Sequence, residues 1–153
     1  MSSKHKKKTM LLYVKEHKCD LGGYARQLQK FGEEHGLSKK LVFQMTLVID
    51  EVVSNTAAYG YTDCDKHCIS VDIHREGNVL VIVIMDTAQP FDLTTAPLPE
   101  LETPVEDRTK PVGGMGIHLV RSLVDSIEYR HENGKNVLEI RKTIDTDGND
   151  VRQ

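Results

Sequence analysis

Glu51 and Asn55 are two polar residues in a stretch whose other side chains are largely apolar. They lie four residues apart within residues 41–61, LVFQMTLVIDEVVSNTAAYGY. The apolar residues recur at helical spacing on one broad arc, which predicts a helix packed on a core. A separation of four places the carboxylate and the amide one turn apart at the border of that arc. On its own, the pair favours a hydrogen-bonded contact at the edge of the core; the other interpretation is a functional pair that faces a ligand.

A glycine-rich run, Gly113-Gly114-Met115-Gly116, comes directly before a predicted helix at residues 117–124. A helix start offers free backbone amides and the positive end of the helix dipole, which together suit a phosphate group. Two familiar phosphate-binding motifs are excluded by spacing: the chain has no GxxxxGK[ST] run, and Leu119 stands where a dinucleotide fingerprint has its third glycine. A flexible junction between loop and helix explains the glycines equally well.

Asp86 ends a continuous apolar run at residues 79–85, which predicts a buried strand. A carboxylate at the mouth of a core can accept a hydrogen bond from an amine of a ligand, although a turn residue that ends the strand is an equally good explanation. The segment that follows, 86–112, contains all five prolines and is too long for a plain connection, which indicates a lid or binding loop. Asp92 is expected to cap this loop.

The elements that would position these residues follow from periodicity and turn signals. Ser38 is expected to cap the helix that carries Glu51, and Asp20 the helix before it. The predicted order is strand 9–17, helix 21–35, helix 41–61, strands 67–75 and 79–85, the long loop, helix 117–124, and strands 126–131 and 136–144 around an Asn133-Gly134 turn. This order predicts an α+β fold, a two-layer sandwich in which a mostly antiparallel mixed sheet carries three helices on one face.

Length and composition fit one globular domain. Of 153 residues, 39% are hydrophobic and 28% charged, and we expect residues 9–144 to form the domain between a disordered basic N-terminus (1–8) and a polar tail (145–153). No apolar run is long enough to span a membrane, and no secretory signal precedes Met10, so the cytoplasm is the expected location.

Charge and cysteine content narrow the classes of partner. The net charge is −3, but four lysines in the first eight residues leave 16 basic against 23 acidic residues elsewhere. An acidic body argues against direct nucleic-acid binding. Cys19, Cys64 and Cys68 form an odd, unpatterned set typical of free thiols, and no second Cys/His pair completes a zinc site with Cys64 and Cys68.

The three motifs occur in a fixed order, and together they resemble the GHKL (Bergerat-fold) ATPases. Within that family the chain is most similar to the small anti-sigma-factor serine/threonine kinases of the RsbW and SpoIIAB type. The matching stretches are residues 49–61 (IDEVVSNTAAYGY) for the N box, 85–92 (MDTAQPFD) for the first glycine box and 113–124 (GGMGIHLVRSLV) for the second. The resemblance extends from about residue 11 to residue 144 and implies the histidine-kinase-like ATPase fold with a long ATP lid.

The resemblance also implies roles for individual residues. Asn55 would hold Mg²⁺ against the phosphates of ATP, and Glu51 would be the general base that takes a proton from a serine hydroxyl or from water. Asp86 would bind the adenine amine, and either Arg108 or Lys110 on the lid would contact phosphate. The full set of implied ATP-binding residues is Asn55, Tyr59, Asp86, Ala88, Arg108, Lys110, Gly113, Gly114, Met115, Gly116 and Ile117.

Two residues depart from the family pattern. Ala88 stands where the family has the glycine of an Asp-x-Gly motif, which would matter most if that glycine needs a positive φ. Tyr59 stands where many relatives have histidine, and its ring is expected either to line the nucleotide pocket or to pack in the core.

The function implied by the resemblance is that of an ATP- and Mg²⁺-dependent protein serine kinase and anti-sigma regulatory factor. Such a protein phosphorylates a STAS-domain anti-sigma antagonist, exchanges it for a sigma factor or an equivalent regulator, and is a homodimer. The alternative is an ATP-gated binding module with little kinase turnover. A third possibility is an α+β scaffold whose nucleotide site has degenerated.

Overall fold

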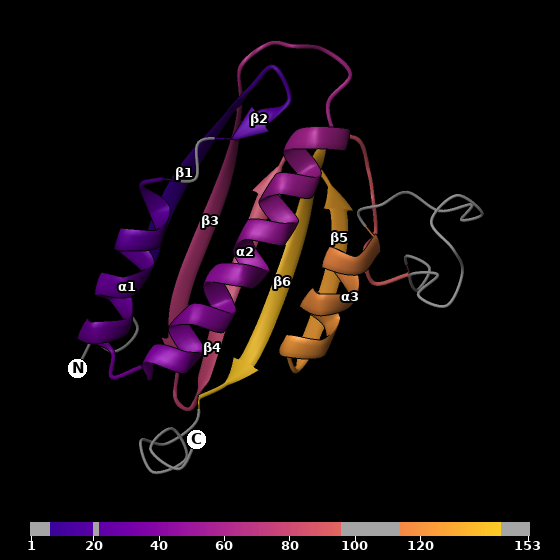
Figure 1. The fold of residues 1–153 in the computed structure, drawn as a ribbon. Helices are drawn as coiled ribbons and strands as arrows, with labels where there is room; N and C mark the ends of the chain where they lie inside the picture. Colours follow the sequence, from indigo (N-terminus) through magenta and orange to yellow (C-terminus); the bar gives the residue numbers. More distant parts are fainter. Residues whose placement is uncertain (1–6, 20–21, 96–113, 145–153) are drawn as a thin grey trace.

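The computed structural model describes residues 7–19, 22–95 and 114–144, and these form three helices and six strands. The helices lie side by side on one face of the sheet (Figure 1), so the predicted α+β sandwich is confirmed. In chain order the elements are β1 (Lys8–Lys15), β2 (Lys18–Cys19), α1 (Tyr24–Glu34), α2 (Lys39–Tyr59), β3 (His67–Glu76), β4 (Val79–Asp86), α3 (Gly114–Leu123), β5 (Ser126–Glu132) and β6 (Lys135–Thr143).

The sheet has the strand order β2-β1-β3-β4-β6-β5. Each pairing between its described strands is antiparallel. The sequence had predicted a mostly antiparallel sheet that also contains parallel pairs. The long strand β4 lies between β3 and β6, and its register places Asp86 opposite Asn136. This register brings two polar residues that are 50 positions apart to the same end of the sheet.

The core lies between the sheet and α2. One side of α2 is buried because its apolar residues recur every three or four positions, as the sequence predicted. Helix α1 adds Tyr24, Leu28 and Phe31 to this core, and α3 adds Val120. The buried residues of α2 are Leu41, Met45, Val48, Ile49, Val52, Val53 and Ala57.

Helix ends and turns follow their sequence signals at several points. The Ser38 hydroxyl accepts a hydrogen bond from the Leu41 amide at 3.1 Å, which confirms the predicted cap of α2. Gly36, which follows α1, has a φ of 70°, and Gly60 caps the C-terminal end of α2. Asn133 and Gly134 both have positive φ values, which permits the tight turn between β5 and β6.

Other boundaries differ from the prediction. β1 ends at Lys15, and Glu16 and His17 turn with positive φ into the short strand β2, which the sequence analysis missed because no glycine marks the turn. α1 begins at Tyr24 without a side-chain cap, whereas Asp20 and Leu21 lie outside the described residues. Tyr24 contributes to the core, whereas the neighbouring Ala25 is exposed.

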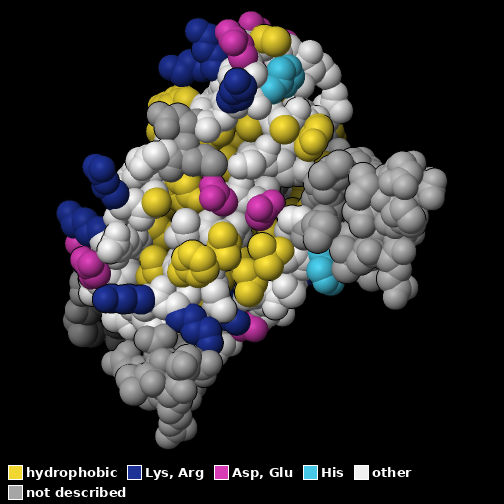
Figure 2. Space-filling view, viewed as in Figure 1, with side chains coloured by type: hydrophobic (Ala, Val, Ile, Leu, Met, Phe, Trp, Pro, Cys, Tyr) yellow, Lys and Arg dark blue, Asp and Glu magenta, His cyan; other side chains and the backbone are white. Residues whose placement is uncertain are grey.

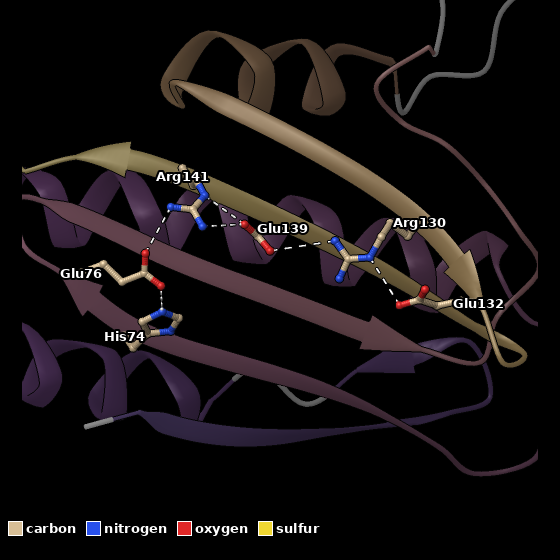
Figure 3. Close-up of polar contacts among 6 residues, drawn as sticks. All are labelled: His74, Glu76, Arg130, Glu132, Glu139 and Arg141. Carbon is tan, nitrogen blue, oxygen red and sulfur yellow. Dashed lines mark hydrogen bonds and ion pairs between the residues drawn. The ribbon is translucent and has the colours of Figure 1, made fainter. Parts of the chain in front are cut away.

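The face of the sheet away from the helices carries a chain of ion pairs (Figure 3). His74 pairs with Glu76 at 2.7 Å, and Glu76 pairs with Arg141 at 3.4 Å across β4. Arg141 also contacts Glu139 at 2.9 Å, and from there the chain continues through Arg130 to Glu132 on β5. These charged side chains therefore find their partners within the sheet itself.

None of the helices in the described part of the chain has the length and apolar character needed to cross a membrane.

Candidate nucleotide-binding site

Glu51 and Asn55 lie in the second half of α2, and both are half-buried at the edge of the core. Neither side chain makes a hydrogen bond or an ion pair with another residue in the described ranges. The hydrogen-bonded pair at the edge of the core is therefore not formed. A half-buried carboxylate and a half-buried amide that have no partner in this part of the chain are available to a ligand.

Gly116 brings the glycine-rich run against Glu51. A Cβ atom added to Gly116 would lie 2.9 Å from the Glu51 carboxyl carbon and would overlap Oε2, so the absence of a side chain at residue 116 permits this approach. The sequence suggested that the glycines precede the helix, but Gly114 and Gly116 belong to the first turn of α3. The glycines thus supply the helix terminus itself, where backbone amides have no partner within the helix.

The remaining residues of the second glycine box are placed as far as the structure describes them. Ile117 is partly buried and packs against the core. Met115 belongs to α3, but its side chain lies outside the description. Gly113, Arg108 and Lys110 lie outside the described residues.

Asp86 is held at the end of β4 through one of its two carboxylate oxygens. Oδ1 accepts hydrogen bonds from the Ala88 amide at 3.0 Å and from Asn136 Nδ2 at 2.8 Å, whereas Oδ2 has no partner in the parts of the chain described. Burial raises the pKa of Asp86, and the hydrogen bonds from Asn136 and Ala88 partly oppose that rise. The oriented carboxylate can therefore accept a hydrogen bond from a ligand through its second oxygen.

Asn136 and Tyr129 form a polar support beneath Asp86 that the sequence analysis missed. The Asn136 amide also donates to the backbone carbonyls of Ala88 at 3.0 Å and Gln89 at 3.3 Å, and its oxygen accepts a hydrogen bond from the Tyr129 hydroxyl at 2.5 Å. The sequence signal for this role was indirect: the β5–β6 turn could have been combined with the antiparallel register to place the start of β6 beside the end of β4.

Ala88 fits its position without a positive φ, because it is not among the described residues that have one. Its methyl group is buried against the end of α2, where a Cβ added to Gly60 would come within 2.7 Å of it. The Gln89 amide donates to the Gly60 carbonyl at 2.8 Å, which fastens the loop to α2. The methyl group at residue 88, where the family has glycine, is thus accommodated in this chain by Gly60 on the facing segment.

Tyr59 does not pack in the core, because 66% of its surface is exposed at the end of α2. Asp92 does cap the loop, since its side chain accepts a hydrogen bond from the Thr94 amide at 2.9 Å. Arg121 on α3 donates to the Leu93 carbonyl at 2.6 Å, and Leu93 is itself buried. The described beginning of the long loop is therefore anchored to the domain.

The candidate site extends along α2 from Glu51 to Gly60. Gly116 and the start of α3 lie beside Glu51, and the Asp86 loop lies beside Gly60. With a rise of 1.5 Å per residue, the two ends are about 13 Å apart along the helix axis, which suits an elongated ligand such as a nucleotide. The residues fit that group: a buried carboxylate lies at one end, free helix amides at the other, and the Asn55 side-chain oxygen between them is a suitable ligand for Mg²⁺.

The fold and this arrangement define a nucleotide-binding domain, and comparison with known proteins agrees. The model of the histidine kinase-like ATPase domain family matches residues 17–142, so the chain belongs to this family. This result confirms the resemblance to the GHKL ATPases.

Curated relatives carry the names of serine kinases. Over 140 residues the chain is 22% identical to the serine-protein kinase RsbW of Listeria innocua, covering 90% of this chain and 88% of that protein. It is 27% identical over 103 residues to the serine/threonine-protein kinase BtrW of Bordetella bronchiseptica, with 67% of this chain and 71% of that protein covered. These names support the resemblance to the RsbW type.

A solved structure of the histidine kinase domain of the blue-light activated histidine kinase of Erythrobacter litoralis is also similar. The superposition has a TM-score of 0.49 at 13% sequence identity and covers 81% of this chain. The chain spans about three fifths of that structure, 61% of its length. At this TM-score the likeness adds nothing to the fold described above.

Proposed function

We propose that this chain is an ATP- and Mg²⁺-dependent protein serine kinase that acts in the cytoplasm as an anti-sigma regulatory factor. Its phosphoryl acceptor would be a serine on a STAS-domain antagonist protein, and its second partner a sigma factor or an equivalent regulator. Membership of the ATPase family and the similarity to proteins named RsbW and BtrW support the proposal. The same resemblance favours a homodimer.

The observation that carries the proposal is the position of Glu51. Its carboxylate has no partner among the described residues and lies against Gly116 in the first turn of α3. A module that only binds a nucleotide has no need of a carboxylate beside an anion-binding helix terminus, because the negative charge would repel phosphate. A kinase does need a base there, within reach of the acceptor hydroxyl.

Each residue of the site then has a distinct task. Bound ATP supplies the phosphoryl group and, with Mg²⁺, the charge neutralisation for its transfer. Glu51 takes the proton from the serine hydroxyl as the new oxygen–phosphorus bond forms and the bond to the departing ADP breaks. Asn55 would hold Mg²⁺ through its side-chain oxygen, and the amides at Gly114 and Gly116 would donate to phosphate oxygens.

Asp86 selects the nucleotide base in this proposal. Its free Oδ2 accepts a hydrogen bond from an exocyclic amine, while Asn136 and the Ala88 amide fix the carboxylate through Oδ1. Tyr59, exposed beside the loop, is available to cover the nucleotide. Arg108 and Lys110 are proposed as phosphate contacts from the lid.

The test is phosphoryl transfer by the purified chain with Mg²⁺-ATP and each STAS-domain protein of the source organism in turn. We expect one of these proteins to become phosphorylated on serine. Tight ATP binding without transfer to any of them would replace the kinase by an ATP-gated binding module. If Mg²⁺-ATP failed even to raise the melting temperature, the site would be degenerate.

A further inference from the structure

We propose that the outer face of α2 and α3 below Glu51 is the docking surface for the phosphoryl-acceptor protein. The partner that fits it is a folded protein whose contact surface is apolar at the centre and acidic at the rim. This inference rests on the proposed kinase function, because it concerns how the acceptor serine reaches Glu51.

The surface has an apolar patch that consists of Phe43, Leu47 and Leu119. Phe43 is 64% exposed, the largest exposure of a phenylalanine among the described residues, and Leu47 and Leu119 beside it are partly buried. None of the three belongs to the core or packs against it. Figure 2 shows hydrophobic side chains gathered over the lower halves of α2 and α3, below acidic side chains at mid-height. Exposed apolar side chains that gather on one surface mark sites of protein interaction.

Helix geometry makes the patch continuous with Glu51. Leu47 precedes Glu51 by one turn on α2, and Phe43 precedes Leu47 by another. Helix α3 runs antiparallel beside α2 (Figure 1), and Leu119 lies one turn beyond Gly116, the residue that contacts Glu51. Phe43 is therefore about 12 Å from Glu51 along the helix axis, with Leu47 and Leu119 between them.

The lower edge of the patch is basic. Lys39 and Lys40 open α2, and they are exposed, make no ion pair within the described residues, and have no acidic residue beside them in the first turn. Cations at the positive end of a helix dipole cost stability. An acidic rim on a bound partner would neutralise these two lysines. Their unpaired positive charge therefore favours a partner whose contact surface is negatively charged.

The usual size of a protein interface also indicates that a partner bound at Glu51 covers the apolar patch. A specific complex buries roughly 800 Å² on each partner, a disc of about 16 Å radius. A protein that presents a serine to Glu51 therefore also covers residues 6 to 12 Å away along α2, unless it approaches entirely from the other side. The exposed Phe43 and the partly buried Leu47 and Leu119 lie within that distance on the N-terminal side of Glu51, and buried apolar anchors dominate the energy of such interfaces.

The experiment uses the STAS-domain protein that the wild-type chain phosphorylates. It measures the dissociation constant of this protein from the chain loaded with Mg²⁺-ADP, and separately the KM and kcat of phosphoryl transfer. Phe43→Ser and Leu47→Ser should each weaken binding roughly tenfold and raise KM by a similar factor. The value of kcat and the affinity for ATP should stay unchanged, because neither side chain belongs to the nucleotide site. Lys39→Glu with Lys40→Glu should weaken binding and flatten its dependence on salt concentration.

Matched controls separate docking from loss of fold. Leu11→Ser removes a side chain of similar exposure, 53%, from the opposite face of the sheet and should change neither KM nor the dissociation constant. Lys30→Glu reverses an exposed charge on α1 and should leave the salt dependence as it is in the wild type. Melting temperatures of all the variants show that they are folded.

The outcomes are distinct. If the wild-type chain phosphorylates its partner and the Phe43 and Leu47 variants bind and turn over normally, the docking surface is wrong and the kinase stands. If these variants change the oligomeric state of the chain and leave partner affinity unaltered, the patch joins two copies and the docking surface is again wrong. If no STAS-domain protein binds the wild-type chain, the proposed function fails and the docking surface fails with it.

Discussion

The two faces of the sheet treat polar side chains in opposite ways. On the open face, six charged or titratable residues form a continuous chain of ion pairs and hydrogen bonds from His74 to Glu132 (Figure 3), and within the described residues the buried polar atoms without a partner on this face are Nδ1 of His74 and the Ser70 hydroxyl. On the helical face, Glu51 and Asn55 have no partner within the described chain, and Asp86 uses one oxygen and leaves the other free. Polar groups that satisfy one another need no ligand, whereas half-buried groups without a partner are ready for one.

The polar groups without partners on the helical face cost free energy of folding, and this cost makes the difference between the two faces informative. A buried polar group that lacks a partner is destabilising, so such groups persist where something else binds them. The ion pairs of the open face are exposed and contribute little to stability. The comparison therefore predicts that substitutions on the helical face change activity, while substitutions on the open face change almost nothing.

The largest effect is expected for Glu51→Gln. The amide keeps the size of the side chain and cannot accept the serine proton, so phosphoryl transfer should fall roughly 10²- to 10⁴-fold. Affinity for Mg²⁺-ATP should persist or improve, because the substitution removes the negative charge of the Glu51 carboxylate from beside the start of α3. Single-turnover transfer and calorimetry measure the two quantities separately. Normal transfer by this variant would remove Glu51 from the chemistry.

Gly116→Ala should give the next largest effect. The added methyl group would overlap the Glu51 carboxylate, and that flexible side chain must move away. A displaced base should slow transfer by roughly a hundredfold. The melting temperature should not fall, because alanine favours a helix over glycine. A folded variant that transfers phosphate at the wild-type rate would contradict the contact between these two residues.

Asn136→Ala should lower stability and nucleotide affinity together. The substitution removes three hydrogen bonds donated to Asp86, Ala88 and Gln89, and an unsatisfied buried group costs about 1–3 kcal/mol. Tyr129→Phe removes only the hydroxyl that supports Asn136 and should cost less. Denaturant unfolding and ATP titration of both variants test this order. Equal affinity in Asn136→Ala and wild type would show that Asp86 needs no support.

Arg141→Ala, on the open face, should have the smallest effect. The side chain links Glu76 and Glu139 in the middle of the ion-pair chain, but it is exposed and screened by water and salt. We expect no change in transfer or ATP affinity and a shift in melting temperature below roughly 2 °C. A large loss of either activity or stability would mean that the two faces do not differ as described.

The sequence predicted the fold well because its signals were local and mutually consistent. The apolar arc of α2, the Ser38 cap and the Asn133-Gly134 turn each determine one element from neighbouring residues. The turn at Glu16 and His17 had no such signal, since it contains none of the glycine, asparagine or aspartate residues that mark a tight hairpin turn, and β2 was missed with it.

The candidate site was predictable only in part, for a physical reason. Glu51, Asn55 and Asp86 could be singled out because each breaks an apolar pattern. Asn136 breaks none, and its role depends on a strand register that joins residues 50 positions apart. The fit of Ala88 depended in the same way on a long-range contact, with Gly60, that no local pattern encodes.

Asp86→Asn supplies the matched variant for the central test, because it should leave the fold intact. Asparagine Oδ1 can still accept the hydrogen bonds from Asn136 and the Ala88 amide. Burial raises the pKa of Asp86 in the folded chain, so the stability linked to its proton is full below the unfolded value near about 3.9 and is lost as pH rises through the folded value. At pH 7 the variant should therefore be at least as stable as the wild type.

The central claim is that the unpartnered groups on the helical face form a nucleotide site, and isothermal titration with Mg²⁺-ATP at pH 7 tests it most directly. We expect the wild-type chain to bind one ATP per site and folded Asp86→Asn to lose this binding, because the amide presents a donor to the adenine amine where the carboxylate presented an acceptor. A wild-type chain that gives no binding heat, or an Asp86→Asn variant that binds as tightly as the wild type, would contradict it.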